Sequence, residues 1–130
     1  MSRLTDLADA VVAALNAAPG VSWATYRDSM ISIWQSCRRY GIVPIMTTIT
    51  QYQTESASAY KGAIRAWNER LKELCADQQV CLVDLWEVLK DTTDNDQIRA
   101  AFRYGAEDRH LSAEGYRACA TAISQSVVGQ

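Results

Sequence analysis

The single histidine of this 130-residue chain, His110, is the residue best suited to acid–base chemistry. It follows Glu107, Asp108 and Arg109 in a polar stretch. Histidine is the usual general base near neutral pH, and a neighbouring carboxylate fixes its tautomer and stabilises the imidazolium ion. On residue types alone, a lone loop histidine beside acids is more often a solvated surface residue. Its chemistry therefore depends on further motifs in the chain.

Other polar positions suggest structural roles. Asp84 follows a short apolar run, where we expect its carboxylate to accept hydrogen bonds from backbone amides. Asn68 lies in a long helical pattern, and we expect its side chain to bond to a neighbouring loop. The acids Asp91, Asp94 and Asp96 suggest calcium, but they lack the glycine and distal glutamate of an EF-hand loop. We interpret them as a solvated loop and expect neither a metal nor a cofactor.

The cysteines are scattered and favour a reduced protein. Cys37, Cys75, Cys81 and Cys119 form no CxxC pair, which argues against zinc and against thioredoxin-type chemistry. The last three have apolar neighbours, where a free cysteine behaves as a small buried hydrophobe. Reduced core thiols predict a cytoplasmic protein, although the even count leaves disulfides open. The four tryptophans fall mostly on helix faces, which favours core packing over ligand stacking.

Composition excludes several classes of protein. Hydrophobic residues make up 48% of the chain and charged residues 22%, which is typical of one globular domain. The formal charge of −2 and the lack of a basic stripe argue against a nucleic-acid partner. No apolar run approaches the roughly 20 residues of a membrane span. After Arg3 there is no continuous apolar segment, so we expect no signal peptide.

Hydrophobic periodicity predicts the elements that must position these residues. Ser22 or Thr25 can cap a helix that ends at Gly41. The other predicted helices are residues 4–17 (with a strand over 10–15 as the alternative), 57–76, a turn over 86–89 and a short helix over 97–103. Ser112 can cap the last helix, whose inward residues are expected to be Tyr116, Cys119, Ala120, Ile123 and Val127.

Two apolar, β-branched runs, residues 42–48 and 80–85, predict buried parallel strands. Polar loops are expected over residues 49–56, 91–96 and 104–111. Alternation of strands and helices predicts an α/β fold, a partial flavodoxin-like three-layer α/β/α arrangement with a short parallel sheet flanked by helices. In such sheets, sites collect beyond the carboxyl ends of the strands, which the His110 loop can reach.

Four motifs in order resemble the later half of the SGNH/GDSL-type serine hydrolases. Residues 107–116, Glu-Asp-Arg-His-Leu-Ser-Ala-Glu-Gly-Tyr, are similar to that family's histidine block. Residues 41–48 resemble its strand with an internal proline, residues 60–74 its helix containing Tyr-Asn-x-x-Leu, and residues 80–85 its Val-x-x-Val-Asp-Leu strand. The resemblance runs from about residue 21 to residue 127 and implies hydrolysis of acyl or acetyl esters by a Ser-His-acid mechanism.

The resemblance assigns roles residue by residue. His110 matches the catalytic histidine, and Glu107 stands where the family has the triad aspartate. Asp108 is a competing acid, only two residues from His110. The family's Gly-x-Asn-Asp block would fall on residues 14–17, where Asn16 would be an oxyanion donor. The local pattern there is helical, which favours Asn16 as a helix residue without a catalytic role.

The family's Gly-Asp-Ser nucleophile block and its oxyanion glycine block are not present in this sequence. We therefore expect residues 1–130 to form a single truncated domain with an atypical helix over 1–20, inactive alone. The alternative is a non-catalytic binding or structural module, for example of phage origin, that reuses the fold. Expected partners are a small ester substrate and either a second copy or a complementing chain that covers an exposed sheet edge.

Overall fold

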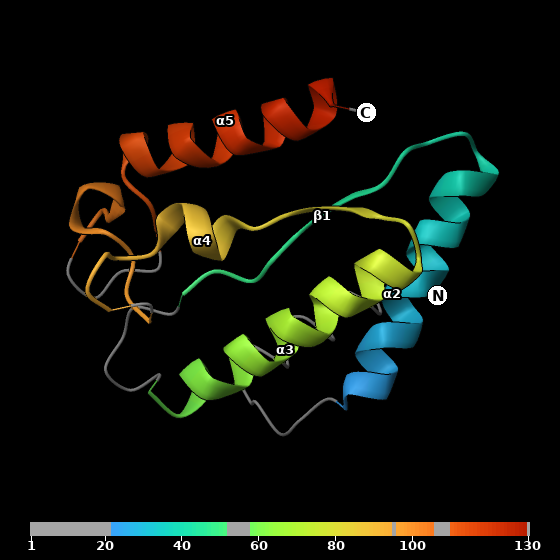
Figure 1. The fold of residues 1–130 in the computed structure, drawn as a ribbon, viewed down its shortest axis with the longest axis horizontal. Helices are drawn as coiled ribbons and strands as arrows, with labels where there is room; N and C mark the ends of the chain where they lie inside the picture. Colours follow the sequence, from blue (N-terminus) through green and yellow to red (C-terminus); the bar gives the residue numbers. More distant parts are fainter. Residues whose placement is uncertain (1–21, 52–57, 95, 106–109, 130) are drawn as a thin grey trace.

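The computed structural model describes residues 22–51, 58–94, 96–105 and 110–129. Within these ranges the elements are α2 (Trp23–Arg39), β1 (Ile45–Thr47), α3 (Ser58–Asp77), β2 (Cys81–Val83), α4 (Leu85–Leu89), the 3₁₀ helix η2 (Ala100–Phe102) and α5 (Ala113–Val128). Figure 1 shows α5 above the strands and α3 below them. This arrangement confirms the predicted α/β class and its layers. The predicted helix over 4–17 and its strand alternative lie outside the described residues.

Local sequence explains the bounds of α2. The Ser22 hydroxyl accepts a hydrogen bond from the Thr25 amide at 3.1 Å, so Ser22 rather than Thr25 is the N-cap. Gly41 follows the last turn with a φ of 71°, a left-handed conformation that glycine adopts without strain. Its amide donates to the Arg38 carbonyl at 3.1 Å. The predicted stop at Gly41 is confirmed.

The two strands are parallel and shorter than predicted. Ile45, Met46 and Thr47 pair in register with Cys81, Leu82 and Val83. Pairing starts only after Pro44 because proline has no amide hydrogen to donate to a ladder. Beyond the ladder, the Thr48 amide still donates to the Val83 carbonyl at 3.1 Å. The carboxyl ends of both strands therefore lie together at one end of the sheet.

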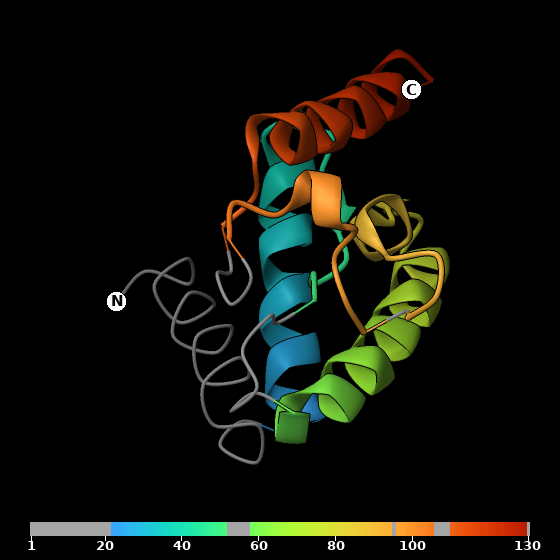
Figure 2. The same cartoon turned by 90° about the vertical axis from the view of Figure 1, so that its left-hand side faces the viewer.

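The larger core joins α2, α3 and the strand layer. Figure 2 shows α2 upright, reaching up toward α5, with α3 inclined beside it. Three aromatic rings pack where α2 meets α3: the Tyr26 and Trp67 centroids are 4.8 Å apart, and those of Trp23 and Trp67 are 5.6 Å apart. All four tryptophans are buried or half-buried, as predicted. The buried members of this core are Tyr26, Met30, Trp34, Leu71, Leu74, Cys75 and Val80.

A second, smaller core lies under α5 and corrects the prediction for three of the five residues expected to face inward on that helix. Leu89, Ile98 and Cys119 form its buried centre. The predicted inward residues Tyr116 and Val127 are instead 55% and 54% exposed, and Ala120, predicted inward as well, is also exposed. The buried residues of α5 are Gly115 and Cys119, so the helix contacts the rest of the chain along a narrower stripe than its apolar residues suggested.

The predicted helix over 97–103 is also wrong for most of its length. Only Ala100–Phe102 is helical, as one 3₁₀ turn. Ile98 is fully buried and lies in an antiparallel bridge with Lys90. The Arg99 amide donates to the Leu89 carbonyl at 2.7 Å, so the backbone bonds across to the end of α4 instead of along a helix.

All four cysteines are free thiols, as predicted. Cys75 and Cys119 are buried, whereas Cys81 is only half-buried. Burial raises the pKa of Cys75 to about 11 and also raises that of Cys119, because the thiolate loses solvation. Among the described residues, no helix is long and apolar enough to cross a membrane.

Candidate functional site

Polar side chains connect the carboxyl ends of the two strands, where sites of α/β proteins collect. Thr48 follows β1, and its buried hydroxyl donates to Asp84 Oδ1 at 3.1 Å across the sheet. The same hydroxyl accepts from the Trp86 amide at 3.0 Å. One threonine therefore joins the end of β1 both to the residue after β2 and to the first turn of α4.

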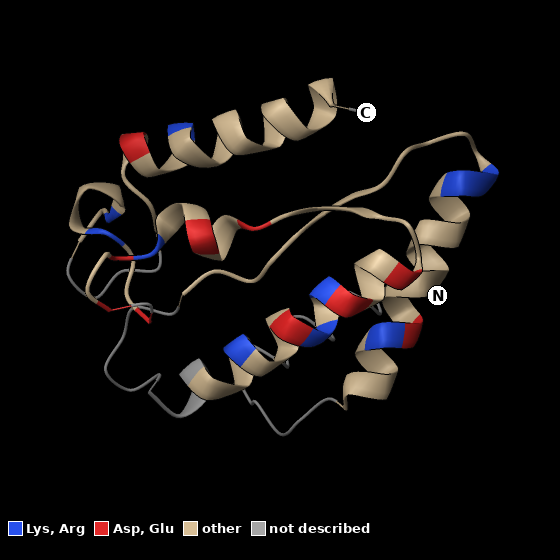
Figure 3. Ribbon diagram, viewed as in Figure 1, with Lys and Arg blue, Asp and Glu red and all other residues tan. Residues whose placement is uncertain are grey.

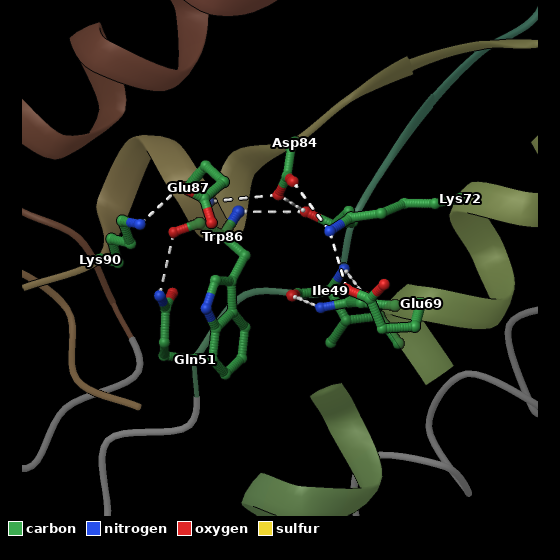
Figure 4. A network of polar contacts seen from close by, with 10 residues as sticks. Ile49, Gln51, Glu69, Lys72, Asp84, Trp86, Glu87 and Lys90 are labelled. Carbon is green, nitrogen blue, oxygen red and sulfur yellow. Dashed lines mark hydrogen bonds and ion pairs between the residues drawn. The ribbon is translucent and has the colours of Figure 1, made fainter. Parts of the chain in front are cut away.

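Asp84 is the second member of this network, and Figure 4 shows its surroundings. Besides accepting from Thr48, its Oδ1 accepts from the Glu87 amide at 3.2 Å and caps α4. Its Oδ2 lies 3.4 Å from Lys72 Nζ, which also bonds Glu69 Oε1 at 2.9 Å. These two carboxylates raise the pKa of Lys72, the bond to Glu69 contributing most. The prediction that Asp84 satisfies backbone amides is confirmed.

Asn68 fixes the loop after β1 to α3. Its buried side chain accepts from the Ile49 amide at 2.9 Å and donates to the Ile49 carbonyl at 2.8 Å. Gln51, two residues further on, donates to the Trp86 carbonyl at 3.0 Å. The predicted role of Asn68 is confirmed, and residues 48–51 are held from both sides.

A cavity of about 250 Å³ lies between α3 and the β2–α4 junction. Its lining residues are Arg65, Asn68, Glu69, Lys72, Asp84, Trp86 and Glu87. The charges are paired with each other: Lys72 with both Glu69 and Asp84, and Arg65 with Asp96 at 3.1 Å. Figure 3 shows this mixture of signs along α3. The third carboxylate of the lining, Glu87, pairs with Lys90 at 2.7 Å, so each charged side chain that lines the cavity has an ion-pair partner.

His110 does not line this cavity. It is exposed and lies between η2 and α5 in the sequence. In Figure 1, η2 and the start of α5 lie on the left, toward which both strands run. The backbone at His110 is held firmly: the His110 carbonyl accepts from the Tyr104 amide at 3.2 Å, and Arg103 and Leu111 form an antiparallel bridge. Backbone bonds thus tie His110 and Leu111 to Tyr104 and Arg103 and form the frame of His110.

The start of α5 completes this frame. The Ser112 hydroxyl accepts from the Gly115 amide at 3.1 Å as the helix N-cap, and it donates to the Ala101 carbonyl at 2.7 Å. The Ser112 amide donates to the Phe102 carbonyl at 2.9 Å. Gly115 packs so closely that an added Cβ would lie 2.6 Å from that same carbonyl oxygen. This close packing explains why the histidine block has a glycine at position 115.

Of the four predicted site residues, the structure describes only His110. Glu107, Asp108 and Asn16 lie outside the described residues, so the choice of acid and the role of Asn16 stay predictions. In the acidic loop, Asp91 and Asp94 accept hydrogen bonds from the Thr93 and Asp96 amides, respectively. No group of three potential metal ligands occurs within the described ranges.

Sequence reasoning missed Thr48 and Gln51 as members of the polar network. The available signal was position: Thr48 directly follows an apolar run, as Asp84 does, and the carboxyl ends of parallel strands meet at one edge. Both runs had been predicted to be parallel strands. Placing these two residues opposite each other would have required the register, which the sequence pattern does not provide.

Solved structures of other proteins have the same fold. Three solved structures share it: a protein of the lipolytic G-D-S-L family from Desulfitobacterium hafniense DCB-2 (TM-score 0.69, 16% identity, 93% of this chain covered), a GDSL-like lipase from Bacteroides thetaiotaomicron VPI-5482 (0.65, 16%, 80%) and a candidate acylhydrolase from Bacteroides fragilis NCTC 9343 (0.66, 19%, 80%). The chain spans 61%, 51% and 50% of their respective lengths. No curated protein sequence matches it.

The sequence itself carries the family assignment. The family model of GDSL-like lipases and acylhydrolases matches residues 6–123, which is most of the chain. That range includes the strands, the Asn68 helix and the His110 loop. This chain belongs to the GDSL-like lipase/acylhydrolase family.

Proposed function

We propose that this chain supplies the histidine part of a GDSL-type acyl-ester hydrolase site and does not hydrolyse esters alone. The observation that supports the proposal best is the frame of His110. A family-matched histidine lies beyond the carboxyl ends of the strands, on a loop closed by the bond from the Tyr104 amide to the His110 carbonyl at 3.2 Å. A general base needs such a fixed position, because proton transfer is steeply sensitive to geometry.

The proposed chemistry is acyl transfer through a serine ester. The imidazole of His110 takes the proton of a serine hydroxyl as that oxygen attacks the ester carbonyl carbon. It then gives the proton to the leaving alkoxide, and a water molecule, activated in the same way, releases the acid and restores the serine. Glu107 or Asp108 holds the imidazole tautomer and stabilises the imidazolium ion. The substrate class is a small acyl or acetyl ester, and the reaction needs no cofactor.

The nucleophile is the element that this chain does not offer. The sequence contains no Gly-Asp-Ser block. Its one Asp-Ser pair, Asp28-Ser29, lies within α2, where Asp28 bonds to Arg27 at 3.0 Å. A nucleophilic serine needs a base within hydrogen-bond reach, and it is usually presented on a sharp turn after a strand. With a base and an acid but no nucleophile, the chain cannot carry out the first step of covalent acyl transfer, which is the attack of a serine oxygen on the ester carbonyl carbon.

A fluorophosphonate probe and p-nitrophenyl acetate test this proposal on the purified chain. We expect no covalent labelling, and hydrolysis no faster than that caused by free imidazole at equal concentration. The His110→Ala variant is the control for the histidine, and Ser29→Ala is the control for the one Asp-Ser serine. If the unaltered chain is labelled and the His110→Ala variant is not, the proposal that the chain is inactive alone is refuted, and the role of His110 as the general base is supported.

A further inference from the structure

Tyr104 lies directly opposite His110 in the frame that holds the histidine. Arg103 and Leu111 form an antiparallel bridge, and the Tyr104 amide donates to the His110 carbonyl at 3.2 Å. In an antiparallel ladder each residue has one partner directly across, and the pairs follow one another in opposite chain directions. The pair next to Arg103 and Leu111 is therefore Tyr104 with His110.

The exposure of the side chains agrees with this register. Successive residues of a strand point to opposite faces, whereas residues directly across a ladder share a face. Arg103 and Leu111 are both half-buried, and Leu111 packs against the smaller core. Tyr104 and His110 are both exposed, Tyr104 to 76%. The phenol ring and the imidazole therefore leave the same solvent-facing side of the frame, from Cβ atoms about 5 Å apart.

The ring of Tyr104 is distinguished by its position and not by its exposure. Single exposed aromatic residues are ordinary on protein surfaces. Tyr40 is also 76% exposed, but it follows α2, whose end lies on the side of Figure 1 opposite to η2 and the start of α5. Tyr104 combines the same exposure with a place beside the one histidine of the chain. Its apolar ring surface is thus open to a molecule that approaches the imidazole.

The chemistry proposed for His110 identifies the part of an ester that lies beside it. In acyl transfer the imidazole gives its proton to the oxygen of the leaving alcohol. That oxygen must come within hydrogen-bond reach of the imidazole, about 3 Å. A ring beside the imidazole is therefore placed to contact the group attached to this oxygen, which is the alcohol part of the ester.

We propose that Tyr104 is a specificity-determining residue that contacts the alcohol part of the ester and favours alcohols that carry a flat apolar ring. The side-by-side position of Tyr104 and His110 rests on the backbone register, whereas the identity of the contacted group rests on the proposed function. A contact between two rings raises affinity by about two- to tenfold beyond the area that it buries. This contact uses the face or edge of the ring and does not need the tyrosine hydroxyl.

NMR of the isolated chain tests the position of the ring, because its one histidine gives unambiguous imidazole signals. We expect a nuclear Overhauser effect between the ring protons of Tyr104 and those of His110. Tyr104→Ala should shift both imidazole resonances, since it removes the ring current of a neighbouring aromatic group. Tyr40→Ala, at the equally exposed tyrosine, is the matched control and should leave them in place. Equal imidazole shifts in the two variants would overturn the proposal.

Titration with two acetate esters tests the selectivity. Benzyl acetate carries a flat ring on its alcohol part and ethyl acetate a short alkyl group, and the imidazole signals of His110 report the binding of each. We expect benzyl acetate to bind about two- to tenfold more tightly than ethyl acetate. Tyr104→Ala should lose this preference, whereas Tyr104→Phe and the control Tyr40→Ala should keep it.

Three results of the titration would overturn the proposal. Equal binding of the two esters would show that no ring is recognised, and a preference that survives Tyr104→Ala would place its cause elsewhere. Loss of the preference in Tyr104→Phe would show that the hydroxyl makes the contact instead of the ring.

These results are distinct from a failure of the proposed function, because binding does not require hydrolysis. Fluorophosphonate labelling of the unaltered chain, together with a ring preference that depends on Tyr104, would refute inactivity alone and support the role of Tyr104. An unlabelled chain that binds both esters equally would support the proposed inactivity and overturn the role of Tyr104.

Discussion

Two glycine-to-alanine substitutions of the same chemistry should change stability in opposite directions. A Cβ at Gly115 would lie 2.6 Å from the Phe102 carbonyl oxygen and 3.0 Å from the Leu111 Cβ. A Cβ added at Gly62, on α3, would have no other described residue's atom within 4 Å, apart from its own helix backbone and chain neighbours. Overpacking costs about 1–3 kcal/mol, and alanine gains about 1 kcal/mol over glycine in a helix. At Gly115 the close neighbour is a backbone oxygen, so we expect a cost at the upper end of the overpacking range and a net loss of about 1–2 kcal/mol for Gly115→Ala, whereas Gly62→Ala should gain about 0.5–1 kcal/mol.

Urea unfolding followed by tryptophan fluorescence measures both variants, and the expected gap of about 2 kcal/mol corresponds to roughly 8 °C in Tm. Gly115→Ala should also disturb the His110 frame, because the Phe102 carbonyl that must move accepts the Ser112 amide. Changed NMR shifts of the Tyr104 and Ser112 amides would report that disturbance, with Gly62→Ala as the control. A change of equal sign and size in the free energy of unfolding of both variants would refute the steric explanation for Gly115.

Two further predictions concern buried polar groups. Asn68→Ala removes both hydrogen bonds to Ile49 and should lower the free energy of unfolding by about 2 kcal/mol in urea titrations. The control substitution at an exposed residue, Gln35→Ala, should lower it by less than about 0.5 kcal/mol. Equal losses in the two variants would contradict the role of Asn68. Burial, with a smaller electrostatic contribution from Cys75, raises the pKa of the Tyr26 hydroxyl from 10.0 to about 12. The unfolded chain therefore loses this proton at a lower pH than the folded protein, and the free energy of unfolding should fall as pH rises from about 10 to 12. Urea titrations at pH 9, 10 and 11 should show a steeper fall for the unaltered chain than for Tyr26→Phe, and parallel curves would contradict the assignment.

The sequence predicted the elements best where one physical cause dominates. Helical spacing of large apolar residues located α2 and α3, and Ser22, Gly41 and Ser112 marked helix ends through local hydrogen bonds and conformation. These are short-range effects that a sequence pattern contains. The strands were predicted too long because their ends depend on which backbone groups find partners across the sheet.

Errors arose where tertiary contacts decide. Tyr116, Ala120 and Val127 have the spacing of an inward face, but in the structure they are exposed, and α5 buries only Gly115 and Cys119. Ile98 was predicted in a helix, whereas the end of α4 offers its neighbour Arg99 a carbonyl across a bridge. At the site, the pairing of Thr48 with Asp84 depends on a register between residues 36 positions apart. Asn68 was predictable because an amide on a helix face beside a loop has few other partners.

The contacts that close β1, α3 and β2 on one another have a consequence for folding order. Asn68 binds Ile49 over 19 positions, and Thr48 binds Asp84 over 36, so all of them lie within one continuous stretch of chain. Bringing such nearby residues together costs little loop-closure entropy. This strand–helix–strand unit can therefore nucleate before α2 or α5 docks, and a nascent chain can build the platform for the histidine loop before that loop has been synthesised.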